Sequence, residues 1–423
     1  MPKLVADKVS FPAPEELWRK RLLLNDRNRV RDCRENLFLV LENHPEWQGV
    51  VAFDEFANRV VKLKKPPYER GEAGPWSGID DLRLAQWMAQ VEGIVVRSTS
   101  TLVEAVSFCA SNHVYHPLRA WLESLKWDGT PRRDDWLTDC AGVEKTPYAM
   151  RVGRYFLANM VARIFEPGCI MRSVPVLEGP QNRGKSTLLR ALAGNDWFSD
   201  THFDVGGKDA YQTIQGVWLY EISEMSSFNK SEAARVKEFV SSIADNFRPP
   251  YDRRNVKVLR QAVFAGTTNE SIYLKDWTGN TRFWPLRTVE IHLEVMAAMR
   301  EQLFAETMHF YLKGERRHPT REEEKELFAP EQEERELQHP WEPMVLAWLD
   351  AGTQSKVTAG DILCECLKFE RSKLLDSHGI TVGRIMSRLG WPRRREPNGL
   401  REWYYERPPK PAPAPLGDTE VPF

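Results

Sequence analysis

One stretch of the chain has the residue types and spacing of a phosphate-binding loop. Residues 179–186 read Gly-Pro-Gln-Asn-Arg-Gly-Lys-Ser, which fits G-x-x-x-x-G-K-[ST] at every fixed position. Glycines let successive backbone N–H groups point inward at an anion, and a helix that begins there adds its positive N-terminal end. An apolar strand is predicted at 174–177, before the loop, and a helix after it. We therefore predict a nucleotide-binding loop, against the alternative of a plain glycine-rich turn.

The side chains of this loop have distinct expected tasks. Lys185 can reach the β- and γ-phosphates of ATP, and Ser186 can hold Mg²⁺. The residues expected to bind the nucleotide are Gly179, Gln181, Asn182, Arg183, Gly184, Lys185, Ser186 and Thr187.

A second acidic element belongs downstream of such a loop. The apolar run 217–221 is predicted to be a strand, and it ends in Glu221, with Glu224 three residues later. An acid at this place can organise Mg²⁺ and its water, and a second can act as a base or orient the attacking water. We therefore expect Glu221 and Glu224 to be catalytic and Glu221 to contact the metal.

Two more polar residues follow or precede buried strands. The run 261–269 ends at Asn269, and a parallel sheet gathers the carboxyl ends of its strands at one edge. We therefore expect Asn269 to orient water near the γ-phosphate. Arg282 precedes another apolar strand, and an arginine that reaches the neighbouring subunit's nucleotide would stabilise transition-state charge.

A basic hairpin is predicted between residues 246 and 260, with its turn at 252–255. It carries the candidate DNA-binding residues Arg248, Arg253, Arg254 and Lys257. An exposed basic hairpin suits contact with a phosphate backbone, against the alternative of a solvated surface turn.

Composition limits the remaining possibilities. The net charge is -1, so DNA affinity must come from local basic patches. No apolar run reaches the roughly 18 residues that a membrane span needs, and the first residues lack a secretory signal, so we expect a cytoplasmic protein. His113 and His116 flank Tyr115 without a cysteine or carboxylate at recognised ligand spacing, so we expect them to be structural.

Seven segments are predicted from composition and periodicity. They are a flexible tail (1–15), a helical N-terminal domain (16–115), a connector (116–147), the α/β P-loop domain (148–315), an acidic linker or exposed helix (316–340), a winged-helix-like domain (341–407) and a disordered proline-rich tail (408–423). In the winged-helix-like domain, residues 382–389 would be the recognition helix and residues 391–405 a wing, against the alternative of a protein-interaction module. Its candidate DNA contacts are Arg384, Arg388, Arg393 and Arg394.

Together these motifs resemble the virulence-associated E family of phages, prophages and mobile islands. The matching stretches are 122–129 (LESLKWDG), 177–187 (LEGPQNRGKST), 197–200 (WFSD), 208–211 (KDAY), 216–218 (GVW) with Glu221 and Glu224, 248–251 (RPPY), 266–269 (GTTN), and 279–280 (GN) with 282–285 (RFWP). That family is similar to the superfamily-three helicases, which are AAA+-like hexameric ring ATPases.

The resemblance implies a role for each motif. Lys185 and Ser186 would bind nucleotide and magnesium, the two glutamates would form the Walker B element, and Asn269 would be the sensor. The basic hairpin would face the central pore, and Arg282 would act in trans. Two positions depart from the family pattern: Thr281 replaces the first of two arginines, and Asn182-Arg183 stands where a glycine is more frequent.

The sequence therefore predicts an ATP-dependent DNA helicase or replication ATPase that works as a ring of identical subunits. No primase site is evident, so a separate primase or other replication protein would be a partner. The alternative is a regulatory or anti-phage DNA-binding AAA+ ATPase without unwinding activity. A metabolic P-loop kinase is a third hypothesis. It is disfavoured because a simple kinase does not need the polar strand end at 266–269 or the arginine that follows it, Arg282.

Overall fold

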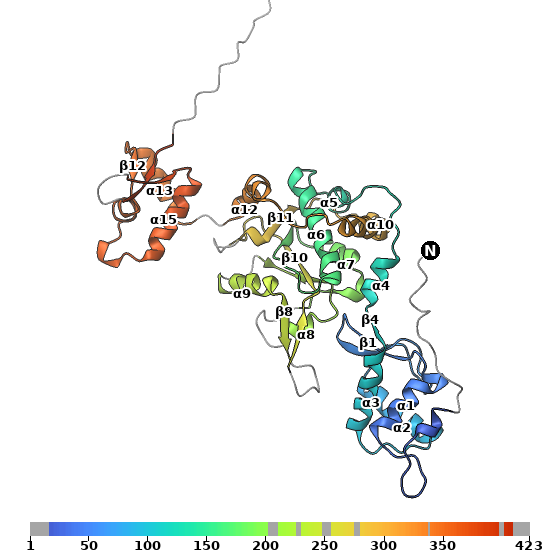
Figure 1. Cartoon of the computed structure of the whole chain (residues 1–423). Coiled ribbons are helices and arrows are strands. Elements are labelled where there is room, and N and C mark those ends of the chain that lie inside the picture. Colours follow the sequence, from blue (N-terminus) through green and yellow to red (C-terminus); the bar gives the residue numbers. More distant parts are fainter. Residues whose placement is uncertain are drawn as a thin grey trace, which may run out of the picture. The chain divides into compact units, whose positions relative to one another are not determined.

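The structure is a computed structural model, and it describes residues 17–201, 210–225, 230–247, 255–274, 280–336, 339–396 and 402–408. The chain forms two compact units, residues 1–336 and 337–423 (Figure 1). It is a mixed α/β protein, as the sequence predicts. None of the described helices is both long enough and apolar enough to cross a membrane.

The first part of the larger unit combines helices with a small sheet. Its elements are α1 (Arg34–Asn43), β1 (Val51–Asp54), β2 (Arg59–Lys62), β3 (Gly74–Pro75), α2 (Gly78–Val91), α3 (Thr99–Asn112) and β4 (Val114–Tyr115). The strand order is β3-β2-β1-β4. The helices were expected, but the sheet was not, because strands of two to four residues are too short for a visible alternation of apolar and polar residues.

The central part of this unit is built on a parallel sheet. Its helices are α4 (Pro117–Ser124), α5 (Trp136–Ala141), α6 (Pro147–Phe165), α7 (Lys185–Ala193), α8 (Ala210–Thr213), α9 (Lys230–Ser241), α10 (Leu293–Leu312), α11 (Arg321–Glu323) and α12 (Ala329–Glu334). Its strands are β5 (Val174–Glu178), β6 (Phe198–Ser199), β7 (Leu219–Ile222), β8 (Ala244–Phe247), β9 (Val256–Leu259), β10 (Val263–Thr268) and β11 (Phe283–Arg287).

Five of these strands form the sheet that carries the candidate site. The order is β11-β5-β10-β7-β6, and every neighbouring pair is parallel. The strands β5, β7 and β10 are buried along their whole length, which explains their near-continuous apolar sequences. The strands predicted at 174–177, 217–221 and 261–269 are therefore confirmed.

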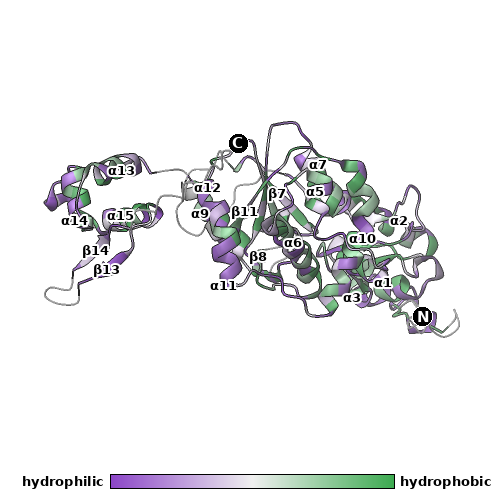
Figure 2. Ribbon diagram, turned by 90° about the horizontal axis from the view of Figure 1, so that it is seen from above, coloured by the Kyte–Doolittle hydropathy of each residue, from purple (hydrophilic) through white to green (hydrophobic). Residues whose placement is uncertain are grey.

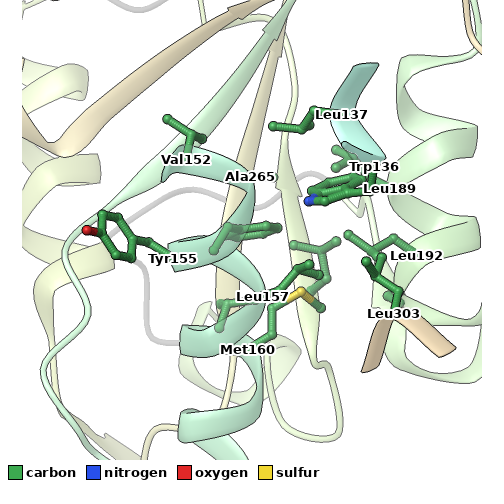
Figure 3. Packing of buried hydrophobic residues seen from close by; sticks show 14 of the residues in the cluster. Trp136, Leu137, Val152, Tyr155, Leu157, Met160, Leu189, Leu192, Ala265 and Leu303 are labelled. Carbon is green, nitrogen blue, oxygen red and sulfur yellow. The ribbon is translucent and has the colours of Figure 1, made fainter. Parts of the chain in front are cut away.

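The main core of the unit lies around α6, whose inner face packs on the sheet and on α5, α7 and α10 (Figure 3). Gly153 of α6 allows a close approach to α5, because a Cβ at this position would lie 2.7 Å from Nε1 of Trp136. Any side chain here would force the two helices apart. By contrast, α9 and α11 carry mostly hydrophilic residues in Figure 2.

The acidic segment expected to be a linker is attached to this core. Phe328 is fully buried and contacts Trp284 and Tyr148, with ring centroids 5.1 and 5.0 Å apart. Gln332 donates a hydrogen bond to the carbonyl of Phe283 on β11, at 3.0 Å. Much of the segment is helical, as the exposed-helix alternative predicted. The polar-spacer alternative was wrong where Phe328, Gln332 and Arg335 are buried against the core.

The smaller unit contains α13 (Trp341–Ala351), β12 (Lys356–Val357), α14 (Ala359–Asp361), α15 (Asp376–Arg388), β13 (Arg393–Arg395) and β14 (Trp403–Glu406). Its strands form an antiparallel sheet in the order β12-β14-β13. A separate core holds it together, centred on Val345, Ile362, Val382 and Ile385. The predicted recognition helix at 382–389 is the second half of α15.

Candidate nucleotide-binding site

The loop at 179–184 connects β5 to α7 through two glycines with positive φ. Gly179 has φ +151°, and a Cβ there would lie 2.7 Å from Oγ1 of Thr288. Gly184 is the N-cap of α7 with φ +87°, a left-handed conformation that glycine adopts without steric cost. Both fixed glycines of the sequence pattern are therefore required by the backbone, and the N-terminal end of α7 closes the loop.

Lys185 turns its side chain back into this loop. Its Nζ donates to the carbonyl oxygens of Gly179 and Pro180, at 2.6 and 2.8 Å, and to Oδ1 of Asn269, at 3.1 Å. Burial lowers the pKa of Lys185, and the Glu221 carboxylate acts in the opposite direction. The ammonium group thus lies among acceptors that it can exchange for phosphate oxygens, and it joins the ends of β5 and β10.

Glu221 is the acidic centre of the arrangement. Its side chain is buried at the end of β7, and its Oε1 accepts hydrogen bonds from Ser186 Oγ at 2.7 Å and Thr267 Oγ1 at 2.6 Å. Its Oε2 is buried and has no hydrogen-bond partner among the described residues. A carboxylate oxygen beside a serine hydroxyl is the oxygen donor set that Mg²⁺ prefers, so the residues fit the metal that the sequence predicts.

The other residues predicted to act here lie around this centre. Asn269 follows β10 and contacts Lys185, as described above. Glu224 lies two residues beyond β7, exposed, with a left-handed backbone (φ 51°). Arg282 ends the short helix before β11, and its Nε donates to Ser241 Oγ of α9 in the same chain, at 3.0 Å. Of the remaining loop residues, Gln181, Asn182, Arg183 and Thr187 are exposed.

The predicted DNA-binding residues are only partly within the described chain. The strands β8 and β9 pair antiparallel, as predicted, and Lys257 is exposed on β9. Arg248, Arg253 and Arg254 lie outside the described residues.

In the smaller unit two of the four predicted arginines line one groove. A cavity of about 830 Å³ lies between α15 and β13, with Arg384 and Arg393 in its lining. Arg388 and Arg394 are exposed and pair with Glu342 at 3.5 Å and Glu406 at 3.3 Å.

Sequence reasoning missed two features of the site. Thr267 bonds Glu221 directly, and its signal was the pair of polar residues, Thr267 and Thr268, at the end of a strand that is otherwise apolar. Glu178, the residue before Gly179, forms a buried ion pair with Arg335, with Nε and Oε1 3.1 Å apart. Burial raises the pKa of Glu178, and the Arg335 guanidinium acts against this rise. No local pattern joins residues so far apart in the chain.

Comparisons with known proteins place the chain in a family. Residues 122–337 match the model of the virulence-associated protein E-like domain, which is about half of the chain. No curated protein matches. Among solved structures, an A-form apo structure of the NrS-1 C-terminal region is 13% identical, with 89% of this chain and 99% of that chain covered and a TM-score of 0.48. A second apo structure of that region is 14% identical, with the same coverage and a TM-score of 0.44. On the family match, this chain belongs to the virulence-associated protein E-like family.

Proposed function

We propose that this chain is the ATPase subunit of a DNA-translocating ring, a helicase or replication ATPase of a phage, prophage or mobile element. The observation that carries the proposal is the meeting of Lys185, Ser186, Glu221 and Asn269 at the carboxyl ends of β5, β7 and β10. Ligands of open parallel sheets bind at this edge. ATP is the proposed substrate, because a loop of this geometry leads into a lysine and a helix N-terminus.

Each residue of the candidate site has a separate proposed role in ATP hydrolysis. Magnesium, when bound with the nucleotide, would neutralise phosphate charge, and Ser186 and Oε2 of Glu221 are the groups placed to hold it. Lys185 would exchange the carbonyls of Gly179 and Pro180 for phosphate oxygens. Glu224 and Asn269 would then orient and deprotonate the attacking water.

The ring is proposed because Arg282, which precedes β11, is the candidate for an arginine that acts on the nucleotide of a neighbouring subunit. Its guanidinium contacts α9 within the chain, and an arginine supplied in trans stabilises charge that develops during phosphoryl transfer. Six subunits are carried over from the family resemblance. A separate primase or other replication protein, and the cytoplasm of a bacterial host, complete the proposed setting.

DNA contact is assigned to two basic surfaces, one in each unit. In the larger unit it is the β8–β9 hairpin, with Lys257 on its second strand. In the smaller unit, which we propose to be a winged helix, it is the groove between α15 and β13, and Figure 2 shows β13 as hydrophilic. Arg393 stacks over the exposed ring of Trp403, with its guanidinium 4.4 Å from the centroid. A basic group beside an exposed aromatic suits phosphate and base contact.

The second candidate is a regulatory or anti-phage ATPase that binds DNA without unwinding it. The groove of the smaller unit favours it, because DNA binding there needs no passage through a ring. Unwinding of a forked duplex separates the two candidates.

The deciding experiment is ATP hydrolysis by the purified chain with and without single-stranded DNA, beside Lys185→Ala. We expect strong stimulation by DNA and loss of turnover in the variant, because the lysine binds the phosphates. DNA-independent turnover would shift the assignment to the regulatory ATPase, and full turnover in Lys185→Ala would remove this site from the reaction.

A further inference from the structure

Three potential metal ligands converge where α1 and α3 end. Cys109 lies on the last turn of α3, His113 caps that helix, and Glu42 lies on the last turn of α1. His113 Nε2 is 3.1 Å from both carboxylate oxygens of Glu42, and Cys109 Sγ is 3.5 Å from Oε2 of the same carboxylate. No two of the three donor atoms are more than 4.8 Å apart. Among the residues that the structure describes, no other such group of three donors occurs.

We propose that Glu42, Cys109 and His113 bind one Zn²⁺ ion, at a site separate from the nucleotide site. A thiolate, an imidazole and a carboxylate are the three ligand types that zinc takes in proteins. Mg²⁺ and Ca²⁺ prefer oxygen ligands throughout, so a sulfur and a nitrogen donor select against them.

Two of the three donor–donor distances fit a tetrahedral ion, and the third, between the donor atoms of Cys109 and His113, is at most 4.8 Å. With a Zn–S bond of about 2.3 Å and a Zn–O bond of about 2.0 Å, tetrahedral geometry separates sulfur and oxygen by about 3.5 Å. The observed distance between Cys109 Sγ and Glu42 Oε2 is 3.5 Å. The 3.1 Å between His113 Nε2 and this oxygen is similarly close to the edge of such a tetrahedron, about 3.3 Å. An ion can therefore be bound with small side-chain movements.

The backbone around the ligands is fixed by other contacts. The N–H of His113 donates to the carbonyl of Ala110, and its own carbonyl accepts from the N–H of Phe53 on β1, both at 3.0 Å. Phe38 of α1 and Phe108 of α3 stack with ring centroids 4.7 Å apart. The two helices that supply the ligands are thus held together without the ion, which lowers the cost of forming the site.

Solvent can reach one side of the group. Cys109 is 2% exposed, whereas the side chains of Glu42 and His113 are 27% and 32% exposed. An ion can enter from this side, and a water molecule can take the fourth position.

The sequence contains part of this site. Cys109 and His113 are four residues apart, so a helix brings them to one face. From the sequence alone, His113 is expected to be structural, because no cysteine or carboxylate stands at a recognised ligand spacing. Cys109, one helical turn before His113, provides a cysteine within reach. Glu42 comes from a different helix, and no sequence pattern predicts it.

The test is metal binding by the full-length chain after removal of metals with a chelator. We expect one Zn²⁺ per chain in competition with a chromophoric chelator, and a thiolate-to-metal charge-transfer band with Co²⁺. Both should be lost in Cys109→Ser and kept in Cys366→Ser, a matched thiol in the other unit. The nucleotide site as described has no thiol, so the Co²⁺ charge-transfer band does not report ion binding there.

Two further variants test the site independently, in case Cys109→Ser fails to fold. His113→Gln alters a partly exposed side chain and should also abolish the band. Glu42→Gln removes a ligand, so it should weaken zinc affinity at least as much as loss of a ligand's hydrogen-bonding partner does, about 10- to 100-fold. Zinc should raise the Tm of the wild type and of Cys366→Ser, and leave that of His113→Gln unchanged. Absence of stoichiometric zinc binding in the wild type, or a full Co²⁺ band in Cys109→Ser, would overturn the proposal.

Discussion

The carboxylate of Glu221 is bonded unevenly. Both hydroxyl donors, Ser186 and Thr267, reach Oε1, while Oε2 is buried without a partner among the described residues. A buried charged oxygen without a donor is costly unless something binds it. Oε2 is therefore the oxygen left available for the Mg²⁺ that we propose, while the hydroxyl of Thr267 is bonded to Oε1.

Loss of this positioning should slow turnover more than it weakens binding. In Thr267→Val we expect kcat to fall about 10- to 100-fold, since a hydrogen bond to a charged group contributes about 1.5–3 kcal/mol. KM for ATP should change little, because Thr267 bonds Glu221 and lies outside the loop. Steady-state ATP hydrolysis measures both constants.

Thr268→Val is the matched control. This neighbour is also buried, but its hydroxyl accepts from the N–H of Glu270 at 3.2 Å. Thr268→Val should keep most of the activity, and Thr267→Ser should restore it. Equal losses in Thr267→Val and Thr268→Val would show that Thr267 has no special role.

At the scale of elements, the start of α2 is held by one carboxylate. Asp80 accepts from Lys62 Nζ at 2.6 Å, from Tyr68 Oη at 2.7 Å, and from the N–H and hydroxyl of Ser77 at 2.8 and 2.7 Å. Burial pushes the pKa of Asp80 up, but the hydrogen bonds from Lys62, Ser77 and Tyr68 outweigh it and lower this pKa to about 2. One side chain thus fixes α2, β2 and the loop between them.

This depressed pKa predicts a pH-dependent stability. The folded pKa lies below the unfolded value of about 3.9, so the ionised Asp80 stabilises the fold fully above that value, and the gain disappears as the pH falls from about 4 to 2. The gain is about 2 kcal/mol. Urea unfolding should therefore give Asp80→Asn a lower free energy of unfolding than wild type at pH 7. The difference between the two free energies should be smaller at pH 3.

Asp81 supplies the control, because burial raises its pKa although Trp76 donates a hydrogen bond to it. The ionised form of Asp81 is disfavoured in the folded state. The free energy of unfolding of wild type relative to that of Asp81→Asn should therefore not decrease as the pH falls. If the free energies of unfolding of wild type and Asp80→Asn differ by the same amount at pH 7 and pH 3, the ionised Asp80 does not stabilise the fold in this way.

The elements that the sequence predicted are those whose signals are local. The loop at 179–186 is contiguous, and the strands β5, β7 and β10 are long apolar runs, so their type and order could be predicted. The partners of Glu221 and Glu178 could not, because Thr267 and Arg335 lie 46 and 157 residues away. The segment around Phe328 was partly mispredicted for a related reason, since its composition is acidic and its attachment depends on a few side chains, Phe328, Gln332 and Arg335, with partners far away in the sequence.

At the scale of the whole molecule, the proposed ring predicts complementation between defective subunits. Lys185→Ala should lose nucleotide binding, whereas Arg282→Ala should bind ATP and fail to hydrolyse it. Each variant alone should be inactive. A 1:1 mixture should regain about one quarter of wild-type turnover, because about one interface in four pairs an intact Lys185 with an intact Arg282 in a head-to-tail ring.

The mixture must be assembled for this result to count. Size-exclusion chromatography of the mixed variants with ATP checks the assembly, and wild type diluted with buffer controls for concentration. Assembled mixtures without recovered turnover, or normal turnover by Arg282→Ala alone, would refute catalysis in trans.

The ion pair between Arg335 and Glu178 links the end of the larger unit to the candidate phosphate-binding loop. Arg335 lies beside the point where the chain leaves the larger unit, and its carbonyl accepts from the N–H groups of Tyr273 and Leu274. Its guanidinium holds Glu178, the neighbour of Gly179. The last described residues of the larger unit are therefore joined, through Arg335 and Glu178, to the backbone beside the candidate phosphate-binding loop. A displacement of Arg335 would displace Glu178 as well.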